Sequence, residues 1–576
     1  MAALSRFVLC SITLLLFSLS AYAEPSKEKT DRPTALDPTR IGNLYLVGKV
    51  WGYLKYHHPA VTSGCLDWDA ELLKRLPELL LFQDRDELLV TLDVWVAELD
   101  GIDKNAACMA AENSIALSRN SSWVSSSALL GDRLSTRLSM AEAPNRASRK
   151  QHYISLVNGV GNPIFQNEPD YKSIDRLDWR YRLLALYRFW NIVEYWSPYR
   201  DLIDSDFDEV LRLFVPQFYS AKDPDDYTRA LMALTASVQD GHTNLWSAIR
   251  ARPPGGEATS PFSVRFVAGR PIIWKRLKVS PDAVNNEGFD IGGLQPGDVL
   301  HAIDGESIEH LVDQWSPFYG VSNRPSLLRE ISPYLLQGDA GPFRATVERS
   351  GETLEVVSRR IPLRSINREG GFVSDRDGET FQDLGAGIAY MKLSTIETTN
   401  VSNYVADLQH FDALIIDIRG YPKSFVVFSL GQHLVRKRTP FARFSNADLS
   451  NPGTFHWTES FSIEPKEPTF DGRIIILVDE NTQSQAEYTA MAFRSAPGAI
   501  VMGSQTAGAD GNVSRIPLPG GHHTAISGIG VFYPDKTPTQ KVGIVPDIEI
   551  LPTSAGIRDG RDEVLEAAIR HVREYL

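Results

Sequence analysis

An internal repeat in the first half of the chain limits its fold more than any other feature of the sequence. Five residues recur at one constant spacing, without insertion or deletion, as expected of a duplicated structural unit. The first set is Trp51, Tyr56, Pro59, Asp69 and Pro77, and the second set is Trp190, Tyr195, Pro198, Asp208 and Pro216. Apolar residues in both copies recur at helical spacing, so we expect two related helical units whose Trp and Tyr side chains pack in the core.

Each copy ends in a helix that is followed by a turn containing Gly. The second turn reads Asp240-Gly241-His242-Thr243, whereas its counterpart in the first copy, Asp100-Gly101-Ile102-Asp103, has no imidazole. His242 is therefore a candidate general base, although a His at a helix end also serves as a surface residue that neutralises the helix dipole. The Ser-rich stretch 105–148 between the copies is expected to be a loop or a poorly packed helix.

The composition is that of an ordinary globular protein. Hydrophobic residues make up 43% and charged residues 23% of the 576 positions, which excludes disordered, fibrous and multi-span membrane proteins. A chain of this length is expected to form several domains. Its formal net charge is −13 and it has no basic run, so we expect no nucleic-acid partner.

The amino-terminal segment has the pattern of a secretory signal peptide. Arg6 precedes an apolar stretch at 7–19, and Ala21-Tyr22-Ala23 matches a small-x-small cleavage site. This stretch is shorter than the roughly 18 to 20 apolar residues that span a bilayer. We therefore expect residues 1–23 to be removed and the protein to be exported, to the periplasm or the extracellular space, with no membrane span. Cys10 would leave with that segment, and whether Cys65 and Cys108 pair stays open.

A β-rich module follows a linker of Pro and Gly residues at 252–256. Strand-like patterns occur at 262–266, 271–275, 343–349 and 352–361, and the Asp304-Gly305 pair predicts a tight hairpin. The segments 292–300 and 303–305 resemble a PDZ domain. That resemblance implies a peptide partner bound by strand addition, and the alternative is a module that serves only as a spacer or a lid.

The last third of the chain alternates strand and helix patterns, which indicates α/β architecture. Compact apolar runs at 387–393, 413–418 and 473–478 predict buried strands. Two of these runs lead into polar segments at 417–422 and 479–487. Because α/β sheets bind ligands at the carboxyl ends of their strands, these two segments are the expected site.

Ser484, in the second polar segment, has two interpretations. The pattern Ser484-Gln485-Ala486-Glu487 before a helical run is typical of a capping box, in which Ser484 bonds a backbone amide and Glu487 reaches back. A Ser at a helix start also lies where free amides and the helix dipole stabilise a developing oxyanion. The two roles compete for one hydroxyl, and the spacing alone favours the cap.

Six motifs in a fixed order resemble the tail-specific (C-terminal processing) serine peptidases, between residues 225 and 555. They are Asp-Gly-His-Thr at 240–243, the PDZ-like module, Leu-Ile-Ile-Asp-Ile-Arg-Gly at 414–420, Ser-Gln-Ala-Glu at 484–487, Thr-Ala-Gly at 506–508 and Gly-Ile-Val-Pro-Asp at 543–547. The resemblance implies that Ser484 is the nucleophile and that the α/β core is crotonase-like.

Departures from the family pattern indicate which branch the chain resembles. Members that use a Ser–Lys pair have a Lys where this chain has Ala509, and no Lys occurs from 485 to 535. The chain therefore looks like the tricorn-core branch, in which a His near this turn is the base, and this carries the base role onto His242. That branch has a Glu where this chain has Gln540, so the residue that orients the base stays open among Asp240, Glu487 and Gln540.

A second departure concerns the oxyanion hole. The family follows Asp-x-Arg-Gly with Asn and a pair of Gly residues, whereas this chain has Tyr421-Pro422-Lys423-Ser424. Gly420 and the Gln485 amide stay as the expected donors. His522 and His523 are reserve bases, with a loop position as the simpler interpretation. The sequence has no motif for a metal or a nucleotide, so we expect neither a metal nor a cofactor.

The sequence therefore predicts a multidomain α/β protein with a duplicated helical amino-terminal region, a PDZ-like β module and an α/β peptidase core. The expected limits are 1–23 for the signal peptide, 24–145 and 146–252 for the helical copies, 258–365 for the PDZ-like module and 366–576 for the core. The expected function is an exported serine peptidase that acts on a peptide or protein substrate without a cofactor. The alternatives are a catalytically degenerate relative that binds peptides or apolar ligands, and an esterase-like hydrolase that uses the same Ser and His.

Overall fold

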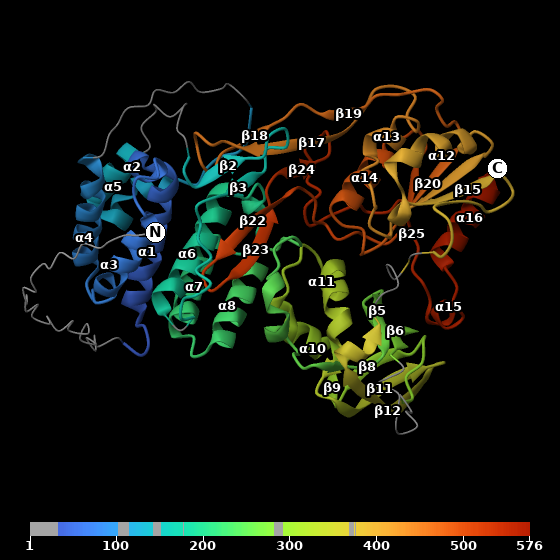
Figure 1. Cartoon of the computed structure of the whole chain (residues 1–576), viewed down its shortest axis with the longest axis horizontal. Helices are drawn as coiled ribbons and strands as arrows, with labels where there is room; N and C mark the ends of the chain where they lie inside the picture. The colour runs from blue at the N-terminus through green and yellow to red at the C-terminus, as the bar shows by residue number, and fades with distance from the viewer. Residues whose placement is uncertain are drawn as a thin grey trace, which may run out of the picture.

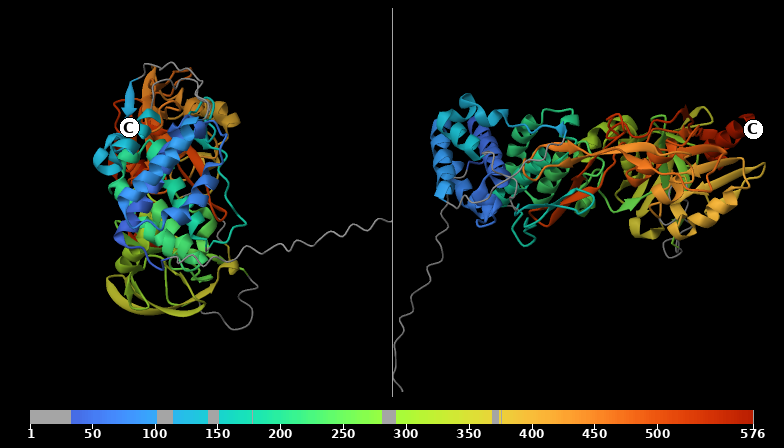
Figure 2. Two further views of the ribbon diagram at one scale, coloured as in Figure 1. Left: turned by 90° about the vertical axis from the view of Figure 1, so that its left-hand side faces the viewer. Right: turned by 90° about the horizontal axis from the view of Figure 1, so that it is seen from above.

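The computed structural model describes residues 33–101, 114–141, 151–176, 178–280, 292–367, 374 and 376–575. Figure 1 shows a helical part in blue to green, a β-rich module in green to yellow and an α/β domain in orange and red. Seen from above, the helical part and the α/β domain occupy opposite ends of an elongated molecule (Figure 2). The expected signal peptide and Cys108 lie outside the described residues, and Cys65 is exposed.

The two helical copies repeat the same local structure. In the first copy, the indole of Trp51 donates to the Trp68 carbonyl (3.0 Å), and in the second, the indole of Trp190 donates to the Phe207 carbonyl (2.7 Å). Both bonds join the long first helix of a copy to the start of the next. The first copy contains α1 (Pro38–His57), α2 (Pro59–Thr62), α3 (Trp68–Leu79) and α4 (Arg85–Ala97), and the second contains α6 (Trp179–Trp196), α7 (Phe207–Ser220) and α8 (Pro224–Ala236).

The copies are joined by ion pairs between equivalent positions. Lys49 of α1 pairs with Asp208 of α7 (2.6 Å), and Arg188 of α6, the position equivalent to Lys49, pairs with Asp69 of α3 (2.5 Å). Lys49, Arg188 and Asp69 are buried, so each charge depends on its partner for compensation. This reciprocal arrangement relates the two copies by approximate two-fold symmetry.

Helices α1 and α6 approach closely because two positions of α1 have no side chain. The Tyr187 ring lies over Gly48, and the Asn191 amide fills the space over Gly52, where a Cβ atom would overlap it. The Asn191 amide also donates to the Gly48 carbonyl (3.1 Å), and the Tyr187 hydroxyl donates to the Leu44 carbonyl (2.8 Å). The interface is therefore a buried, hydrogen-bonded contact with no room for additional atoms.

The expectation of loop or poorly packed helix at 105–148 is wrong for its central part. Helix α5 (Ser127–Ala141) lies there and buries Leu130, Leu134 and Leu138 against the first copy. Leu134 and Leu138 lie one helical turn apart, whereas Leu130 precedes a break in the helix at Gly131, so the sequence shows no long apolar stripe. Residues 102–113 and 142–150 lie outside the described part of the chain.

The β-rich module contains the strands that the sequence predicts. An antiparallel sheet has the order β10-β4-β12-β11-β8-β6-β5, and α10 (Ile308–Trp315) and α11 (Arg324–Ile331) pack against its core. Asp304 and Gly305, both with positive φ, form the predicted two-residue turn between β8 and β9. The strands are β4 (Ala258–Thr259), β5 (Phe262–Val267), β6 (Arg270–Arg276), β8 (Val299–Ile303), β9 (Glu306–Ser307), β10 (Gln337–Gly338), β11 (Gly341–Arg349) and β12 (Glu352–Pro362), and β7 (Lys278–Val279) pairs with β13 (Ile366–Asn367) outside this sheet.

The α/β domain is built on a sheet of order β14-β15-β16-β20-β21-β25, in which the pairs from β15 onward are parallel. Successive residues face opposite sides, and helices cover both faces. One face packs on α12 (Val401–Leu408), α13 (Val427–Gly431) and α14 (Gln485–Arg494), and the other on α16 (Glu563–Tyr575). The strands are β14 (Phe381–Asp383), β15 (Ile388–Lys392), β16 (Ala413–Asp417), β20 (Arg473–Val478), β21 (Ile500–Gly503) and β25 (Ile548–Glu549), and α15 (Ser554–Arg558) precedes α16.

Two extensions of the α/β domain reach the helical part (Figure 1). One is a sheet in which β17 pairs with β18, β19 and β24, and β18 pairs with β1. The other is the hairpin of β22 and β23, whose carbonyls at Pro517 and Pro519 accept hydrogen bonds from Arg188 (3.0 Å) and Tyr227 (2.7 Å). The strands are β1 (Ile115–Leu117), β17 (Thr439–Ala447), β18 (Phe455–Trp457), β19 (Phe461–Ile463), β22 (Val513–Leu518), β23 (His522–Ser527) and β24 (Gly530–Phe532), and β2 (Ile154–Leu156) pairs with β3 (Pro163–Phe165) nearby.

None of the helices among the described residues is both long enough and apolar enough to cross a membrane.

We expect the same change, Gly to Ala, to destabilise the protein at position 52 of α1 and not at position 42. A methyl group at 52 overlaps the buried Asn191 side chain, so thermal melting should show a loss of about 1–3 kcal/mol, which is typical of overpacking. At 42 the nearest atom is an Arg212 nitrogen 3.5 Å away, so Ala should be neutral or stabilise the helix by up to about 1 kcal/mol. Equal effects of the two variants would contradict the close approach of α1 and α6.

Candidate active site

Ser484 lies on a strained turn between β20 and α14. Its backbone has φ 57° and ψ −123°, a combination that residues with a side chain rarely adopt. The Ser484 amide donates to the Ala509 carbonyl (2.9 Å) and to the Glu487 carboxylate (3.1 Å), and these bonds hold the turn. A strained Ser on the turn that joins an inner strand of a parallel sheet to the following helix has the geometry of a nucleophile elbow.

Glu487 anchors this turn. Its buried carboxylate accepts hydrogen bonds from the amides of Gly508 (2.7 Å), Ala509 (3.0 Å) and Ser484, and from the Thr506 hydroxyl. Burial raises the pKa of Glu487 and these donors oppose the rise, with a net pKa above the usual value. The Glu487 half of the predicted capping box is therefore present, and it also fastens the 506–509 segment to the Ser484 turn.

The turn after α8 brings together Asp240, His242 and Ser527 of β23. The His242 Nδ1 atom lies 2.9 Å from the Ser527 hydroxyl, which in turn donates to the Asp240 carboxylate (3.0 Å). The Asp240 carboxylate also accepts from the amides of Ser527 (2.7 Å) and His242 (3.0 Å). Burial raises the pKa of Asp240, but the hydrogen bonds and charge of His242 and the Ser527 amide outweigh burial and leave it below the usual value.

This chain of hydrogen bonds sets the tautomer of His242. A hydroxyl has one proton, and the Ser527 hydroxyl gives it to Asp240, so the lone pair of Ser527 must accept the proton on Nδ1 of His242. Nε2 is then the unprotonated ring nitrogen. The arrangement therefore leaves His242 able to accept a proton at Nε2.

Of the three residues that the sequence offers for orienting His242, the structure places only Asp240 against the imidazole. Glu487 lies under the Ser484 turn, as described above. Gln540 donates to the Ser322 hydroxyl (3.2 Å), which accepts the Gly241 amide (2.7 Å), so Gln540 contacts the His turn only through Ser322.

Ser484, Gln485 and His242 line one cavity of about 1030 Å³. Its walls come from the helical part, from Arg329 and Glu330 of the β-rich module and from the α/β domain. No hydrogen bond joins Ser484 to His242 within the described part of the chain. The two side chains thus share a cavity with no described hydrogen bond between them.

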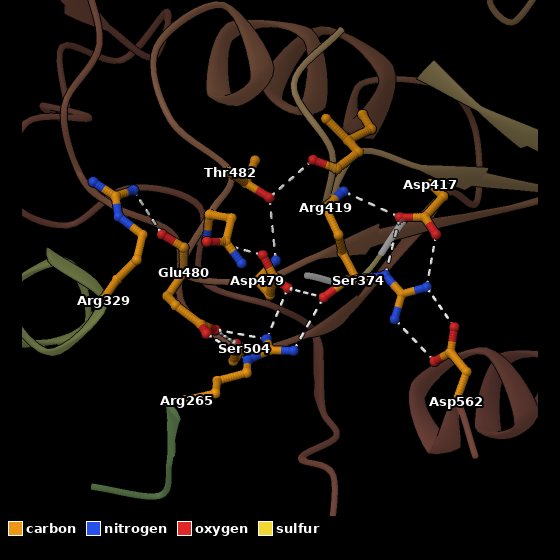
Figure 3. Close-up of polar contacts among 12 residues, drawn as sticks. Arg265, Arg329, Ser374, Asp417, Arg419, Asp479, Glu480, Thr482, Ser504 and Asp562 are labelled. Carbon is orange, nitrogen blue, oxygen red and sulfur yellow. Dashed lines mark hydrogen bonds and ion pairs between the residues drawn. The ribbon is translucent and has the colours of Figure 1, made fainter. Parts of the chain in front are cut away.

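The charged residues at the ends of β16 and β20 form a structural network (Figure 3). Arg419 makes paired hydrogen bonds to Asp417 (2.6 and 3.0 Å) and to Asp562 (2.7 and 2.9 Å). In the β-rich module, Arg265 binds Asp479 (2.8 Å) and Glu480 (2.6 Å). Each of these carboxylates is paired with an Arg side chain, and the pairs hold the loops that follow β16 and β20 in position.

Thr482 links the two loops directly. Its hydroxyl donates to the Ile418 carbonyl (3.1 Å) and accepts the Asp479 amide (3.1 Å), as Figure 3 shows. Arg329 of α11 binds the same segment through the Glu480 carbonyl (2.9 Å) and the Gln483 side chain (2.6 Å). The β-rich module is thus part of the support for the Ser484 turn.

The two expected oxyanion donors are placed differently. Gln485, the first residue of α14, lines the cavity, whereas Gly420 is buried and does not line it. Tyr421, the next residue, lines the cavity and is 40% exposed.

The comparisons with known proteins agree with this geometry. Residues 387–550 match the model of peptidase family S41. The matched segment contains Tyr421, Ser484, Glu487, Asp510 and Ser527, and His242 lies outside it.

The S41 match is accompanied by similarity to individual proteins. Tricorn protease homolog 2 of Streptomyces coelicolor is 22% identical over 66% of this chain, and the match spans 31% of the length of that protein. Mature CPAF in complex with lactacystin has a TM-score of 0.53 at 13% identity, covering 69% of this chain and 98% of that chain. Mature CPAF alone gives a TM-score of 0.50 with the same identity and coverage. These structural likenesses show a shared multidomain α/β fold.

Two functional candidates of this S41-like site were missed by sequence reasoning. Ser527 gave no signal, because it lies 285 residues from His242 and nothing marks a lone Ser in a strand. Asp510 follows Ala509, the position at which the sequence lacks a Lys.

His522 and His523 prove to be part of β23, and neither lines the cavity. Burial, Arg176 and His523 lower the pKa of His522 to about 4.

One wall of the cavity is aromatic. Tyr488 of α14 lies 6.2 Å from Phe425 and 5.9 Å from Phe444, measured between ring centroids, and Phe428 and Phe461 extend the wall. Phe425, Phe428 and Phe461 are each more than 40% exposed. Large apolar side chains exposed together in a cavity provide binding surface for an apolar group.

Asp510 lines the same cavity as a buried carboxyl group. One of its oxygens accepts the Gly511 amide (2.8 Å), and the other has no hydrogen-bond partner among the described residues. Burial, together with the charge of Glu487, raises the pKa of Asp510 well above its usual value. No group of His, Cys, Asp and Glu residues in the described chain could hold a metal ion.

We expect Asp510→Asn to be increasingly stabilising as the pH rises from 4 to 8. Folding raises the pKa of Asp510 above its value of about 3.9 in the unfolded chain, so the folded state loses stability as the pH rises above that value. Asn has no proton to lose, so the variant does not lose this stability. The gain, of the order of 1 kcal/mol at pH 8, should appear in melting temperatures and vanish near pH 4. Asp339→Asn, at an exposed position, is the matched control and should show no such trend. A difference that is independent of pH would contradict the raised pKa.

Proposed function

We propose that this chain is a serine-type peptidase that cleaves peptides or protein tails through an acyl-enzyme. Ser484 is the nucleophile and His242 is the base. One observation carries the proposal: a strained Ser at a strand-to-helix turn and an imidazole bonded to Ser527 through Nδ1 line the same cavity, although they come from different parts of the chain. The match of residues 387–550 to peptidase family S41 supports it.

In the proposed reaction, the Ser484 hydroxyl attacks the carbonyl carbon of the substrate and gives its proton to Nε2 of His242. The electron pair of the C=O bond moves to the oxygen. When the tetrahedral intermediate collapses, the C–N bond breaks and His242 returns the proton to the leaving amine. Water then cleaves the acyl-enzyme by the same route. No hydrogen bond joins the two side chains among the described residues, and catalytic hydrogen bonds of this kind often tighten only when the substrate is bound.

Asp240 and Ser527 complete this mechanism as positioning residues. When His242 takes a proton, the imidazolium is stabilised through Ser527 by the buried Asp240 carboxylate, whose lowered pKa keeps it charged. The Nδ1 atom also lies 3.6 Å from the nearer Asp240 oxygen. A Ser thus stands between the acid and the base.

The substrate part of the proposal rests on the cavity and on the β-rich module. The aromatic wall of Phe425, Phe428 and Phe461 favours apolar substrate side chains. The PDZ-like pattern of the module favours capture of an extended peptide by strand addition. The signal-peptide pattern at 1–23 supports export to the periplasm or the extracellular space as part of the same proposal.

A second candidate function is favoured by the aromatic wall together with the lack of a described hydrogen bond between Ser484 and His242. In this alternative the chain is a catalytically degenerate relative that binds peptides or apolar ligands in the cavity. It predicts saturable binding without an acyl-enzyme. An esterase-like hydrolase would instead turn over short-chain esters without cleaving peptides.

We expect a fluorophosphonate probe to label the wild-type protein and not Ser484→Ala. His242→Ala should be labelled about 10² to 10⁴ times more slowly, which is the usual contribution of a general base. Intact-protein mass spectrometry with peptide mapping measures the extent and position of the label. Unchanged labelling of Ser484→Ala would refute the nucleophile, and an unlabelled wild-type protein that binds apolar peptides would favour the second candidate.

We expect Ser527→Ala to lower the labelling rate while leaving the fold intact. Without the hydroxyl, Asp240 can no longer act through Ser527 on Nδ1, so the rate should fall about 10- to 10²-fold, within the range for a general base that is no longer held in place. Ser514→Ala is the matched control, since Ser514 is also buried in this hairpin but bonds Asn162. Equal rates for the two variants would exclude a role for Ser527.

A further inference from the structure

The loop that precedes α11 in the β-rich module lies against the turn after α8. The Gly241 amide donates to the Ser322 hydroxyl of this loop (2.7 Å). A Cβ atom on Gly320 would lie 1.9 Å from the Thr243 carbonyl oxygen, so the backbones of the loop and the turn are packed together. The module therefore contacts the residues on both sides of His242.

Asn323, the next residue of the loop, binds the other turn of the site. Its side-chain amide donates to the carbonyls of Thr506 (2.8 Å) and Lys541 (3.1 Å). Thr506 belongs to the segment that Glu487 fastens to the Ser484 turn. Two adjacent residues of the module thus bind the turn of the expected base and the support of the expected nucleophile.

The two turns also touch each other, at Gly241. A Cβ atom at Gly241 would lie 2.9 Å from the Cβ atom of Ala509, whose carbonyl accepts the Ser484 amide (2.9 Å). The Gly241 carbonyl accepts the side-chain amide of Gln483, which directly precedes the Ser (3.4 Å). Because Gly241 is next to His242 in the chain, a shift of Gly241 would move His242 relative to Ser484.

The Ser322 hydroxyl has a second donor, which is the side chain of Gln540. The buried Gln540 amide donates to this hydroxyl (3.2 Å), whose oxygen thus accepts two N–H groups and uses both of its lone pairs. Gln540, one of the residues that the sequence offers for orienting the base, therefore acts through Ser322 on the backbone of the His242 turn and not on the imidazole.

Asn323 also fixes the loop to α11. Its side-chain oxygen accepts the Ser326 amide (2.9 Å), and its own amide donates to the Ser326 hydroxyl (3.2 Å), which are the reciprocal bonds of a capping box. Arg329, further along α11, binds the Glu480 carbonyl and the Gln483 side chain. The helix and the loop before it therefore form one support for both turns.

We propose that Ser322 and Asn323 are positioning residues that set the separation between His242 and Ser484. The inference rests on the proposed serine peptidase function and deepens it. Proton transfer from Ser484 to His242 needs a close approach of the two groups, and a displacement of about 1 Å can cost about 10²-fold in rate. On this proposal the β-rich module is a required part of the catalytic apparatus, rather than a spacer or a lid.

The test compares the rates at which a fluorophosphonate probe labels Ser322→Ala, Asn323→Ser and the wild-type protein. The first change removes the acceptor of the Gly241 amide, and the second removes the side-chain amide but keeps a residue that caps helices well. Each should slow labelling about 10- to 10²-fold. Neither change should further slow the residual labelling of His242→Ala, because both act through the imidazole.

Ser260→Ala is the matched control. Ser260 is a buried Ser of the same module, and its hydroxyl forms a hydrogen bond with the Ser358 hydroxyl (3.1 Å) inside that module. This variant should be labelled as fast as the wild-type protein. Thermal melting identifies the variants that are folded at the labelling temperature, and if Ser322→Ala is not among them, Asn323→Ser decides the test.

The outcomes separate this inference from the proposed function. Wild-type labelling rates for Ser322→Ala and Asn323→Ser would overturn the inference, while an unlabelled Ser484→Ala would leave the serine mechanism intact. Equal slowing with and without the His242 side chain would also overturn it, because the two residues would then have a merely structural role. If the wild-type protein is not labelled, the proposed function fails and this inference fails with it.

Discussion

Two hydrogen bonds from Ser527 to the Asp240 carboxylate fasten the helical part of the molecule to the α/β domain at the cavity. They link a turn after α8 to the end of β23, and both partners are buried. A charged acceptor makes such bonds shorter and stronger than neutral ones. The position of His242 relative to Ser484 depends on this junction, because the imidazole has no other described polar side-chain partner than Ser527 and Asp240.

Only the second of the two helical copies carries the imidazole, and this copy contacts the α/β domain. The reciprocal pairs Lys49–Asp208 and Arg188–Asp69 make the copies equivalent at their interface. Their surroundings are not equivalent, because the hairpin of β22 and β23 packs on α6 and α8 of the second copy, while α4 and α5 lie at the far end of the molecule (Figure 1). The α/β domain therefore lies against the second copy, whose last turn carries His242.

The elements with local sequence signals agree with the sequence-based predictions. The strands at 262–266, 343–349, 413–418 and 473–478 follow from apolar alternation or apolar runs, and the Asp304-Gly305 turn follows from the φ values it needs. The buried part of helix α5 was missed because the helix is broken at Gly131, which leaves only a short apolar pattern in the sequence. Predictions of this kind fail where the helical periodicity of a single segment is weak.

The part of the site that could not be predicted depends on contacts between distant segments. Ser484 and His242 were identifiable from motifs, but Ser527 reaches His242 through a hairpin that crosses to another part of the molecule. Gly420 was expected as a donor from the backbone pattern, but the next residue, Tyr421, lines the cavity and Gly420 does not. The sequence therefore does not reveal how side chains at the ends of two adjacent strands lie relative to each other.

Backbone strain and buried carboxyl groups make the structure around Ser484 unfavourable, and nearby hydrogen bonds and ion pairs compensate for this cost. The turn holds a Ser at φ 57°, and two buried carboxyl groups, Glu487 and Asp510, lie next to each other with raised pKa values. Strain and burial of this kind persist only where surrounding bonds over-determine the structure. Four hydrogen bonds converge on Glu487, and the paired Arg419 and Arg265 fix the strand ends on either side. Since these supports come from the α/β domain and, through Arg265 and Arg329, from the β-rich module, the module is a structural part of the site.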